Sequence, residues 1–168
     1  MITGTISIAD YLHAQRLHRK SIAKWAYIAG TAIAACGVVM LVVGSTNYGL
    51  IALCASLGSF IGEGVSSRFL LPRRVAKLHA QQKALSEQFT YSWDAEHICA
   101  QSPIGSVKRP WNHYLKVKED DHVFLLYHND QIFEMLPKSW FSSSDAVKEF
   151  RKLADRQIEA PIPVPDNT

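Results

Sequence analysis

The chain has 168 residues, a formal net charge of +3 and three cysteines. This length suits one soluble domain, or a membrane hairpin with a small domain attached. Cys36 and Cys54 lie inside apolar stretches, the third cysteine is Cys99, and no two form a CxxC pair. The composition therefore argues against a disulfide framework and against a structural zinc site.

Residues 1–24 predict a cytoplasmic juxtamembrane helix. A short β-prone piece, Thr5-Ile6, precedes Ser7 and Asp10, which have the spacing of a capping box. Basic side chains follow at Arg16, Arg19 and Lys20. They are candidate contacts for a protein partner or for anionic lipid headgroups, or they serve only to set the membrane topology.

Residues 25–71 predict a transmembrane hairpin. Its first span, residues 25–44, is a run of about 20 residues without a charge, which is enough to cross a bilayer core of roughly 30 Å. The second span, at about residues 49–70, is interrupted by Glu63 and Arg68. The uncharged segment Ser45 to Tyr48 is expected to connect the two spans.

Positive charge flanks the hairpin at its outer ends, and the connecting segment has no Lys or Arg. The positive-inside rule then places both termini in the cytoplasm and the connection outside. We expect a multi-pass protein of the bacterial inner (cytoplasmic) membrane, with the lipid bilayer as its first partner.

Small residues recur at every fourth position in both spans, at Ala26, Gly30, Ala34, Gly58 and Gly62. Such rows allow two helices to approach closely in lipid. Folding the hairpin about Thr46–Asn47 would place Gly30 opposite Glu63, so we expect the two rows to face each other. The alternative is that the same glycine row joins two copies of the chain in a homo-oligomer.

Glu63 is a candidate functional carboxylate, because burying a charge in a membrane is unfavourable unless it is paired. A simpler interpretation is that Glu63 lies near the inner interface. There it would reach the headgroups, be protonated, or bond Tyr27 or Ser67. We favour this simpler interpretation.

Residues 72–88 predict an amphipathic linker helix, with Pro72 breaking or kinking the chain before it. Arg73 and Arg74 are further candidate partner or headgroup contacts. From residue 89 the apolar period changes to two, and about five to six short antiparallel strands follow. A last helix begins near Ser142-Ser143-Ser144, with Val147, Phe150 and Ala154 on its apolar face.

The predicted fold class is an α+β membrane protein. A two-helix transmembrane hairpin is followed by a small antiparallel domain at residues 89–159, which a C-terminal helix caps. A bent sheet closed by one helix is a pleckstrin-homology-like arrangement. The proline-rich segment 160–168 predicts a disordered tail.

The chain resembles the YcxB-like family of small bacterial membrane proteins. The resemblance rests on the opening Ile6-Ser7-Ile8-Ala9-Asp10-Tyr11, the two spans, Trp111, the apolar strand pair 122–136 and the segment Leu136-Pro137-Lys138-Ser139-Trp140-Phe141. It implies a C-terminal domain similar to bacterial pleckstrin-homology-like domains. It brings no established reaction, cofactor or catalytic residue.

No catalytic signature stands out. His97 and Cys99 share a strand face, but a metal site needs three or four converging ligands. Ser142 to Ser144 lack a GxSxG elbow, and no phosphate-binding GxxxxGK[ST] loop occurs. Lys108 and Arg109 form a basic cluster that suits an acidic partner or headgroups but is too small for nucleic acid. We therefore expect no enzyme activity, no cofactor, no metal and no nucleic-acid partner.

Three functional hypotheses remain. In the first, the cytosolic domain binds a protein partner or lipid headgroups at the membrane surface. In the second, the protein is an accessory subunit, inhibitor or immunity protein of a membrane complex or toxin, and the hairpin is the recognition surface. In the third, which is the least favoured, oligomers build an ion or proton pathway around Glu63.

Overall fold

The computed structural model describes residues 1–82, 85 and 87–158. It divides into two compact units. One, the hairpin unit, comprises residues 15–77, and the other, the domain, comprises residues 1–14 and the chain from residue 78 onward. The predicted tail at residues 160–168 and part of the predicted linker 72–88 lie outside the described residues.

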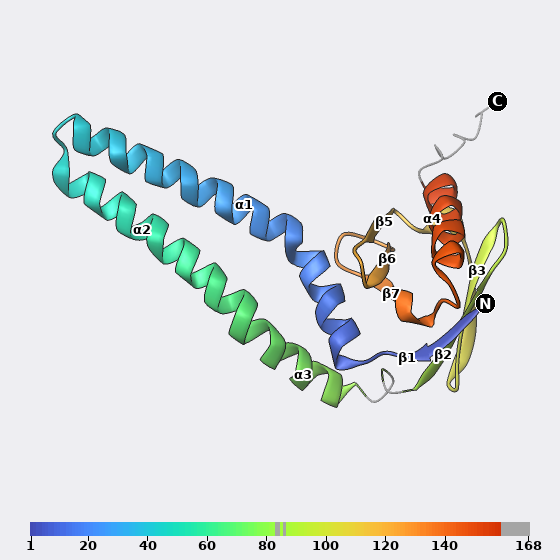
Figure 1. Ribbon diagram of the computed structural model, residues 1–168. Coiled ribbons are helices and arrows are strands. Elements are labelled where there is room, and N and C mark those ends of the chain that lie inside the picture. The colour runs from blue at the N-terminus through green and yellow to red at the C-terminus, as the bar shows by residue number, and fades with distance from the viewer. Residues whose placement is uncertain (83–84, 86, 159–168) are drawn as a thin grey trace, which may run out of the picture. The chain divides into compact units, whose positions relative to one another are not determined.

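Two long helices run side by side in the hairpin unit (Figure 1). They are α1 (Ile8–Val42) and α2 (Thr46–Val65), and α2 continues into the helical residues that follow it. Both helices are long and apolar enough to cross a membrane, and only 11% of the most apolar window of each is buried. A core helix of a soluble protein would bury most of that surface, so the predicted pair of apolar helices is confirmed as two candidate spans.

The turn between α1 and α2 corrects the predicted connection at Ser45 to Tyr48. Gly44 has a φ of +89° and ends α1. Its N–H donates to the carbonyl of Leu41 at 3.2 Å, and the N–H of Ser45 donates to that of Met40 at 2.9 Å. These two bonds define a Schellman motif, which favours glycine at its left-handed position. Thr46 to Tyr48 therefore belong to the first turn of α2.

The helix continues through Pro72, so of the two predicted effects, a break or a kink, the break does not occur. A π-helical turn, η1 (Ser66–Leu70), precedes it, and α3 (Leu71–Gln81) continues beyond it. The N–H of Leu71 bonds to the carbonyl of Ser66, five residues earlier. Proline lacks an N–H and crowds the carbonyl four residues before it, and the wider turn accommodates both effects within a continuous helix.

The domain consists of two antiparallel sheets and a C-terminal helix. The first sheet has the order β1-β2-β3-β4 and the second β5-β6-β7. The strands are β1 (Ile2–Thr5), β2 (Gln88–Trp93), β3 (His97–Ser102), β4 (Gly105–Pro110), β5 (Lys116–Glu119), β6 (Val123–Tyr127) and β7 (Phe133–Pro137). The helix is α4 (Ser144–Ile158), and the six strands after residue 87 match the predicted pattern.

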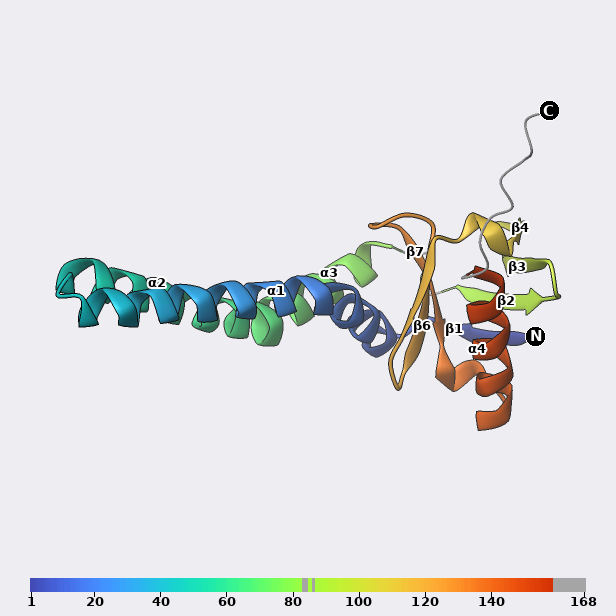
Figure 2. The same ribbon diagram turned by 90° about the horizontal axis from the view of Figure 1, so that it is seen from above.

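Strand β1 comes before the hairpin, yet it belongs to the sheet that follows the hairpin (Figure 2). It pairs with β2 in the register Ile2↔Tyr91 and Thr3↔Thr90, and the hydroxyls of these two threonines lie 3.1 Å apart. The predicted domain of residues 89–159 omits this strand. The capping box predicted at Ser7 and Asp10 forms immediately after β1 and begins α1, with both backbone-to-side-chain distances at 3.1 Å.

The core of the domain lies between the sheets and α4. Trp111, Phe124 and Phe150 are almost completely buried there, together with Leu126 and Leu136. Trp111, one of the residues that carry the family resemblance, is thus a core residue, and the predicted apolar face of α4 is confirmed. The N–H of Ala146 donates to the hydroxyl of Ser143, so the serine run caps α4 as predicted.

Candidate functional site

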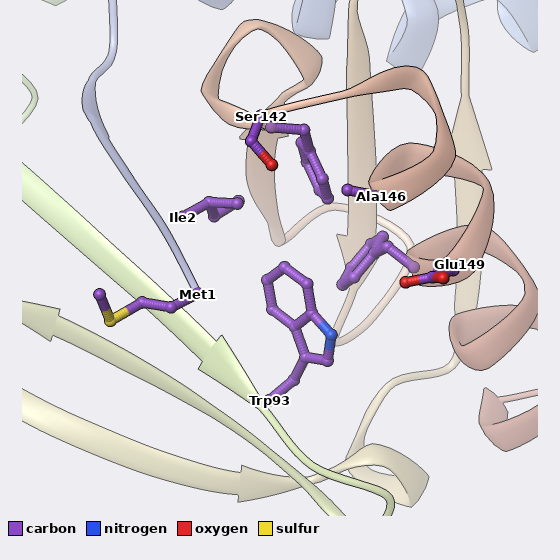
Figure 3. A pocket seen from close by; sticks show the side chains of 8 residues that line it. Met1, Ile2, Trp93, Ser142, Ala146 and Glu149 are labelled. Atoms are coloured by element: carbon purple, nitrogen blue, oxygen red, sulfur yellow. The ribbon is translucent and has the colours of Figure 1, made fainter.

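A cavity of about 240 Å³ opens between β1, the end of β2 and the first turns of α4. Figure 3 shows the indole of Trp93 on one side of it and Ala146 and Glu149 of α4 on the other. The remaining lining residues are Met1, Ile2, Phe141, Ser142 and Phe150. The cavity therefore combines apolar and aromatic walls with two polar side chains, those of Ser142 and Glu149.

Local structure places each wall of this cavity. Trp93 is the last residue of β2, where the alternation of that strand directs it toward α4. A 3₁₀ turn, η4 (Lys138–Trp140), follows β7 and delivers Phe141 and Ser142 to the start of α4. Ile2 comes from β1. The sequence contains no signal for this cavity, because nothing in it indicates that Ile2 lies beside Trp93 and Phe141.

A polar network lies elsewhere in the domain and centres on Glu134 of β7. Arg109 of β4 forms an ion pair with Oε1 of Glu134, and Nε2 of His128 lies 3.0 Å from the same oxygen. The hydroxyl of Tyr114 donates to Oε2 at 3.1 Å. This carboxylate has three partners and joins β4 of one sheet to β7 of the other. Its sequence signal was a single acidic residue within an apolar strand.

Two tyrosines near Glu134 are held in their neutral form. Burial raises the pKa of both Tyr91 and Tyr114, and the negative charge of Glu134 raises the pKa further in each case. Neutral phenols serve as hydrogen-bond donors rather than as bases or nucleophiles. The arrangement is therefore suited to fixing the two sheets relative to each other.

Two exposed carboxylates of the domain accept hydrogen bonds that lower their pKa. The N–H groups of Glu96 and His97 donate to Oδ1 of Asp94, and these bonds lower the pKa of Asp94. A hydrogen bond from Lys116 likewise lowers the pKa of Asp130. Within the described residues, no three His, Cys, Asp or Glu side chains converge in a way that could hold a metal ion.

In the hairpin unit, Glu63 has a specific partner within the chain. Nη2 of Arg19 lies 3.6 Å from Oε2 of Glu63, and the guanidinium also approaches the hydroxyl of Ser66 at 3.4 Å. The bonds suggested for Glu63 with Tyr27 or Ser67 are not the observed ones. Tyr27 stacks on Phe60, and Ser67 donates to the carbonyl of Gly64.

The contact between α1 and α2 uses only part of the predicted rows. Gly30 packs against Phe60, and its carbonyl accepts a 2.8 Å bond from the buried hydroxyl of Ser56. Gly37 and Gly49 approach each other, and a Cβ on Gly37 would lie 3.1 Å from the carbonyl oxygen of Gly49.

The predicted packing of Gly58 and Gly62 between the two helices is not observed. A Cβ added to either would meet nothing within 4 Å, so neither lies in the helix-pair contact. The turn centres on Gly44 rather than on Thr46–Asn47, and this shift brings Ser56 rather than Glu63 to Gly30. On α1, Ala26 and Ala34 are partly buried, whereas most of their neighbours are exposed.

The predicted basic contact residues separate into two groups. The side chains of Arg19 and Arg109 are engaged with Glu63 and Glu134, respectively. The exposed members are Arg16, Lys20, Arg73, Arg74 and Lys108. All of these except Lys108 lie in the hairpin unit, close in sequence to its apolar segments. Of the predicted contact residues, these five are the ones available for an external partner.

Together these features define a small α+β domain, built around a cavity and a polar network, in a chain with two candidate membrane spans. Residues 93–154 match the model of the YcxB-like protein family. The resemblance seen in the sequence is thereby confirmed over that segment, which contains β3 to β7 and most of α4. No curated protein and no solved structure gives a significant match to the chain.

Proposed function

We propose that this protein is a non-enzymatic, membrane-anchored binding protein whose cytosolic domain takes up a segment of a protein partner. The observation that carries the proposal is the aromatic cavity beside α4, which opens between elements on either side of the hairpin in sequence. Concave sites that combine aromatic side chains with convergent polar groups are typical binding sites. The Glu134 network, in contrast, is satisfied within the domain.

The membrane location is part of this proposal. The apolar faces of α1 and α2 are exposed in the chain, as expected for lipid contact. The chain leaves β1 to enter the hairpin and returns to β2, which pairs with β1. This pairing supports placing both ends of the hairpin on one side of the membrane, and the positive-inside rule favours the cytoplasmic side of a bacterial inner membrane.

Exposed basic residues support a subsidiary contact with anionic headgroups. Arg16, Lys20, Arg73 and Arg74 are exposed beside the apolar segments of the hairpin unit. Each basic side chain near an anionic surface contributes about 1 kcal/mol. The two sheets of four and three strands with one C-terminal helix also support a pleckstrin-homology-like assignment for the domain.

Site-specific photo-crosslinking in living cells tests partner binding. A benzoylphenylalanine at Ser142, on the rim of the cavity, should give one discrete adduct, whereas the same probe at exposed Lys152 of α4 should not. Trp93→Leu in the same chain should remove the adduct. Equal adducts from both positions, or an adduct that survives Trp93→Leu, would contradict the proposal.

A second candidate function is recognition of the hairpin by a membrane complex or toxin. It is favoured by the open face of α2 at Gly58 and Gly62, which the helix pair leaves unused. The same face is available to a second copy of the chain. Gly58→Leu should then abolish function or association while the domain stays folded, whereas a protein that is fully active with this substitution would argue against both forms of the idea.

A further inference from the structure

We infer that the cavity beside α4 binds a positively charged side chain, lysine or arginine, of the partner segment. The inference rests on the proposed function and names the chemistry that the cavity recognises. Four features of the site lead to it: the arrangement of the aromatic rings, the charge at the rim, the size of the cavity and its open mouth.

The aromatic rings form a compact cluster. The ring centres of Trp93 and Phe150 lie 4.7 Å apart, those of Trp93 and Phe141 5.8 Å, and those of Phe141 and Phe150 5.5 Å. Phe150 is almost completely buried, and Trp93 is the ring with the most exposed surface among them. The face of an indole is the aromatic surface that attracts a cation most strongly.

The rim of the cavity carries one carboxylate, that of Glu149. Figure 3 shows the carboxylate of Glu149 at the edge of the cavity and the hydroxyl of Ser142 directed into the cavity. Its neighbours on α4, Asp145 and Lys148, form an ion pair with each other at 2.9 Å. Among the described residues Glu149 has no ion-pair partner, so a cationic ligand would gain an opposite charge there and an anionic ligand would be repelled.

The size suits one long side chain. A volume of about 240 Å³ is below the roughly 300–1,000 Å³ that is typical of small-molecule sites. The mouth is open, because Met1 is 86% exposed and does not fill the cavity. A four-carbon stem along the aromatic rings would bring an ammonium group to Glu149, which combines apolar packing with charge pairing.

The test uses the full chain in lipid nanodiscs, labelled with ¹⁵N-tryptophan. The probes are the blocked amino acids Nα-acetyl-lysine amide and Nα-acetyl-arginine amide, with Nα-acetyl-norleucine amide as a control of similar length without the charge. Trp93→Phe identifies the indole N–H resonance of Trp93. We expect this resonance to shift to saturation with both cationic probes and to respond about tenfold more weakly to norleucine.

Glu149→Gln should weaken binding of the lysine probe by about three- to fivefold, as expected for a partly exposed ion pair, and should leave norleucine unaffected. Glu96→Gln neutralises a highly exposed carboxylate outside the cavity and should change nothing. Equal binding of lysine and norleucine, or no effect of Glu149→Gln, would overturn the inference. Competition by lipid would also overturn it. If phosphatidylethanolamine in the nanodiscs shifted the Trp93 resonance and prevented the lysine probe from binding, the bound cation would be a lipid headgroup.

The two proposals fail separately. A Ser142 crosslink that persists in cells without any lysine preference in nanodiscs would leave the proposed function standing and remove this inference. Lysine binding in nanodiscs without a crosslink in cells would show that the cavity binds a cation but would remove the proposed function.

Discussion

Gly4 of β1 lies directly against the indole ring of Trp140, and a Cβ on Gly4 would overlap that ring. The contact joins the strand before the hairpin to the turn η4 before α4. Together with the β1–β2 pairing, it makes the first residues of the chain part of the domain and one wall of its cavity.

Gly4→Ala should therefore destabilise the domain by about 1–3 kcal/mol, because the indole must move to make room for the methyl group. For a domain of this size that corresponds to a fall of several degrees in the melting temperature, measured by near-ultraviolet circular dichroism of the full chain in detergent. Gly105→Ala is the matched control, since a Cβ there meets nothing within 4 Å. Equal melting temperatures for the two variants would show that Trp140 does not depend on Gly4.

Glu134→Gln should destabilise the domain by about 1–3 kcal/mol, since it removes the charge that holds Arg109, while Tyr114 can still donate to the amide oxygen. Glu96→Gln changes a highly exposed carboxylate and should alter stability by less than about 0.5 kcal/mol. The same melting experiment compares the two. A neutral effect of Glu134→Gln would mean that the network does not join the sheets.

Alkaline pH should destabilise the domain through Tyr91 and Tyr114. Their pKa values are raised in the folded state. Their contribution to the free energy of unfolding is therefore fully present below the unfolded-state pKa of about 10, and it is lost as the pH rises from there through the folded-state pKa. Unfolding in denaturant should become easier above about pH 10, and Tyr91→Phe should reduce this dependence. A phenolate absorbance from Tyr91 that appears near pH 10 in the folded protein would contradict the burial of this side chain.

The helix pair of the hairpin unit should distinguish between two glycines of α2. A Cβ on Gly49 would lie 2.6 Å from Cγ of Leu41, whereas one on Gly62 meets nothing within 4 Å. Both Gly→Ala changes raise helix propensity similarly, so a difference between them reports packing. Gly49→Ala should lower the temperature at which the detergent-solubilised protein aggregates, and Gly62→Ala should not. A lower aggregation temperature for Gly62→Ala than for Gly49→Ala would indicate that Gly62 lies in the contact between the helices.

Much of the architecture could be predicted from the sequence because the signals are local. The two apolar runs, the alternation from Phe89 onward and the serine cap of α4 each reflect contacts between residues that are close in the chain. The Schellman turn at Gly44 also has a local signal, a glycine at the end of an apolar helix, although the predicted connection lies slightly later in the chain.

The remaining features depend on distant contacts. Nothing in Ile2 to Thr5 indicates that its partner is β2, because the strand is only 4 residues long and the whole hairpin intervenes. The cavity was missed for the same reason, since one of its walls comes from β1. On α2, small residues occur on more than one face, and only the position of the turn selects the face at Gly49 and Ser56.

Strand β1, before the hairpin, completes the domain after it, and an engineered disulfide tests this pairing directly. In a chain with Cys36, Cys54 and Cys99 replaced by alanine, Thr3→Cys combined with Thr90→Cys places two thiols on directly opposed residues of β1 and β2. Mild oxidation of membranes should give a crosslinked, faster-migrating protein for this pair. It should give none for Thr3→Cys with Gln101→Cys, which lie two strands apart, about 9–10 Å. Crosslinking of neither pair, or of both pairs equally, would contradict the claim.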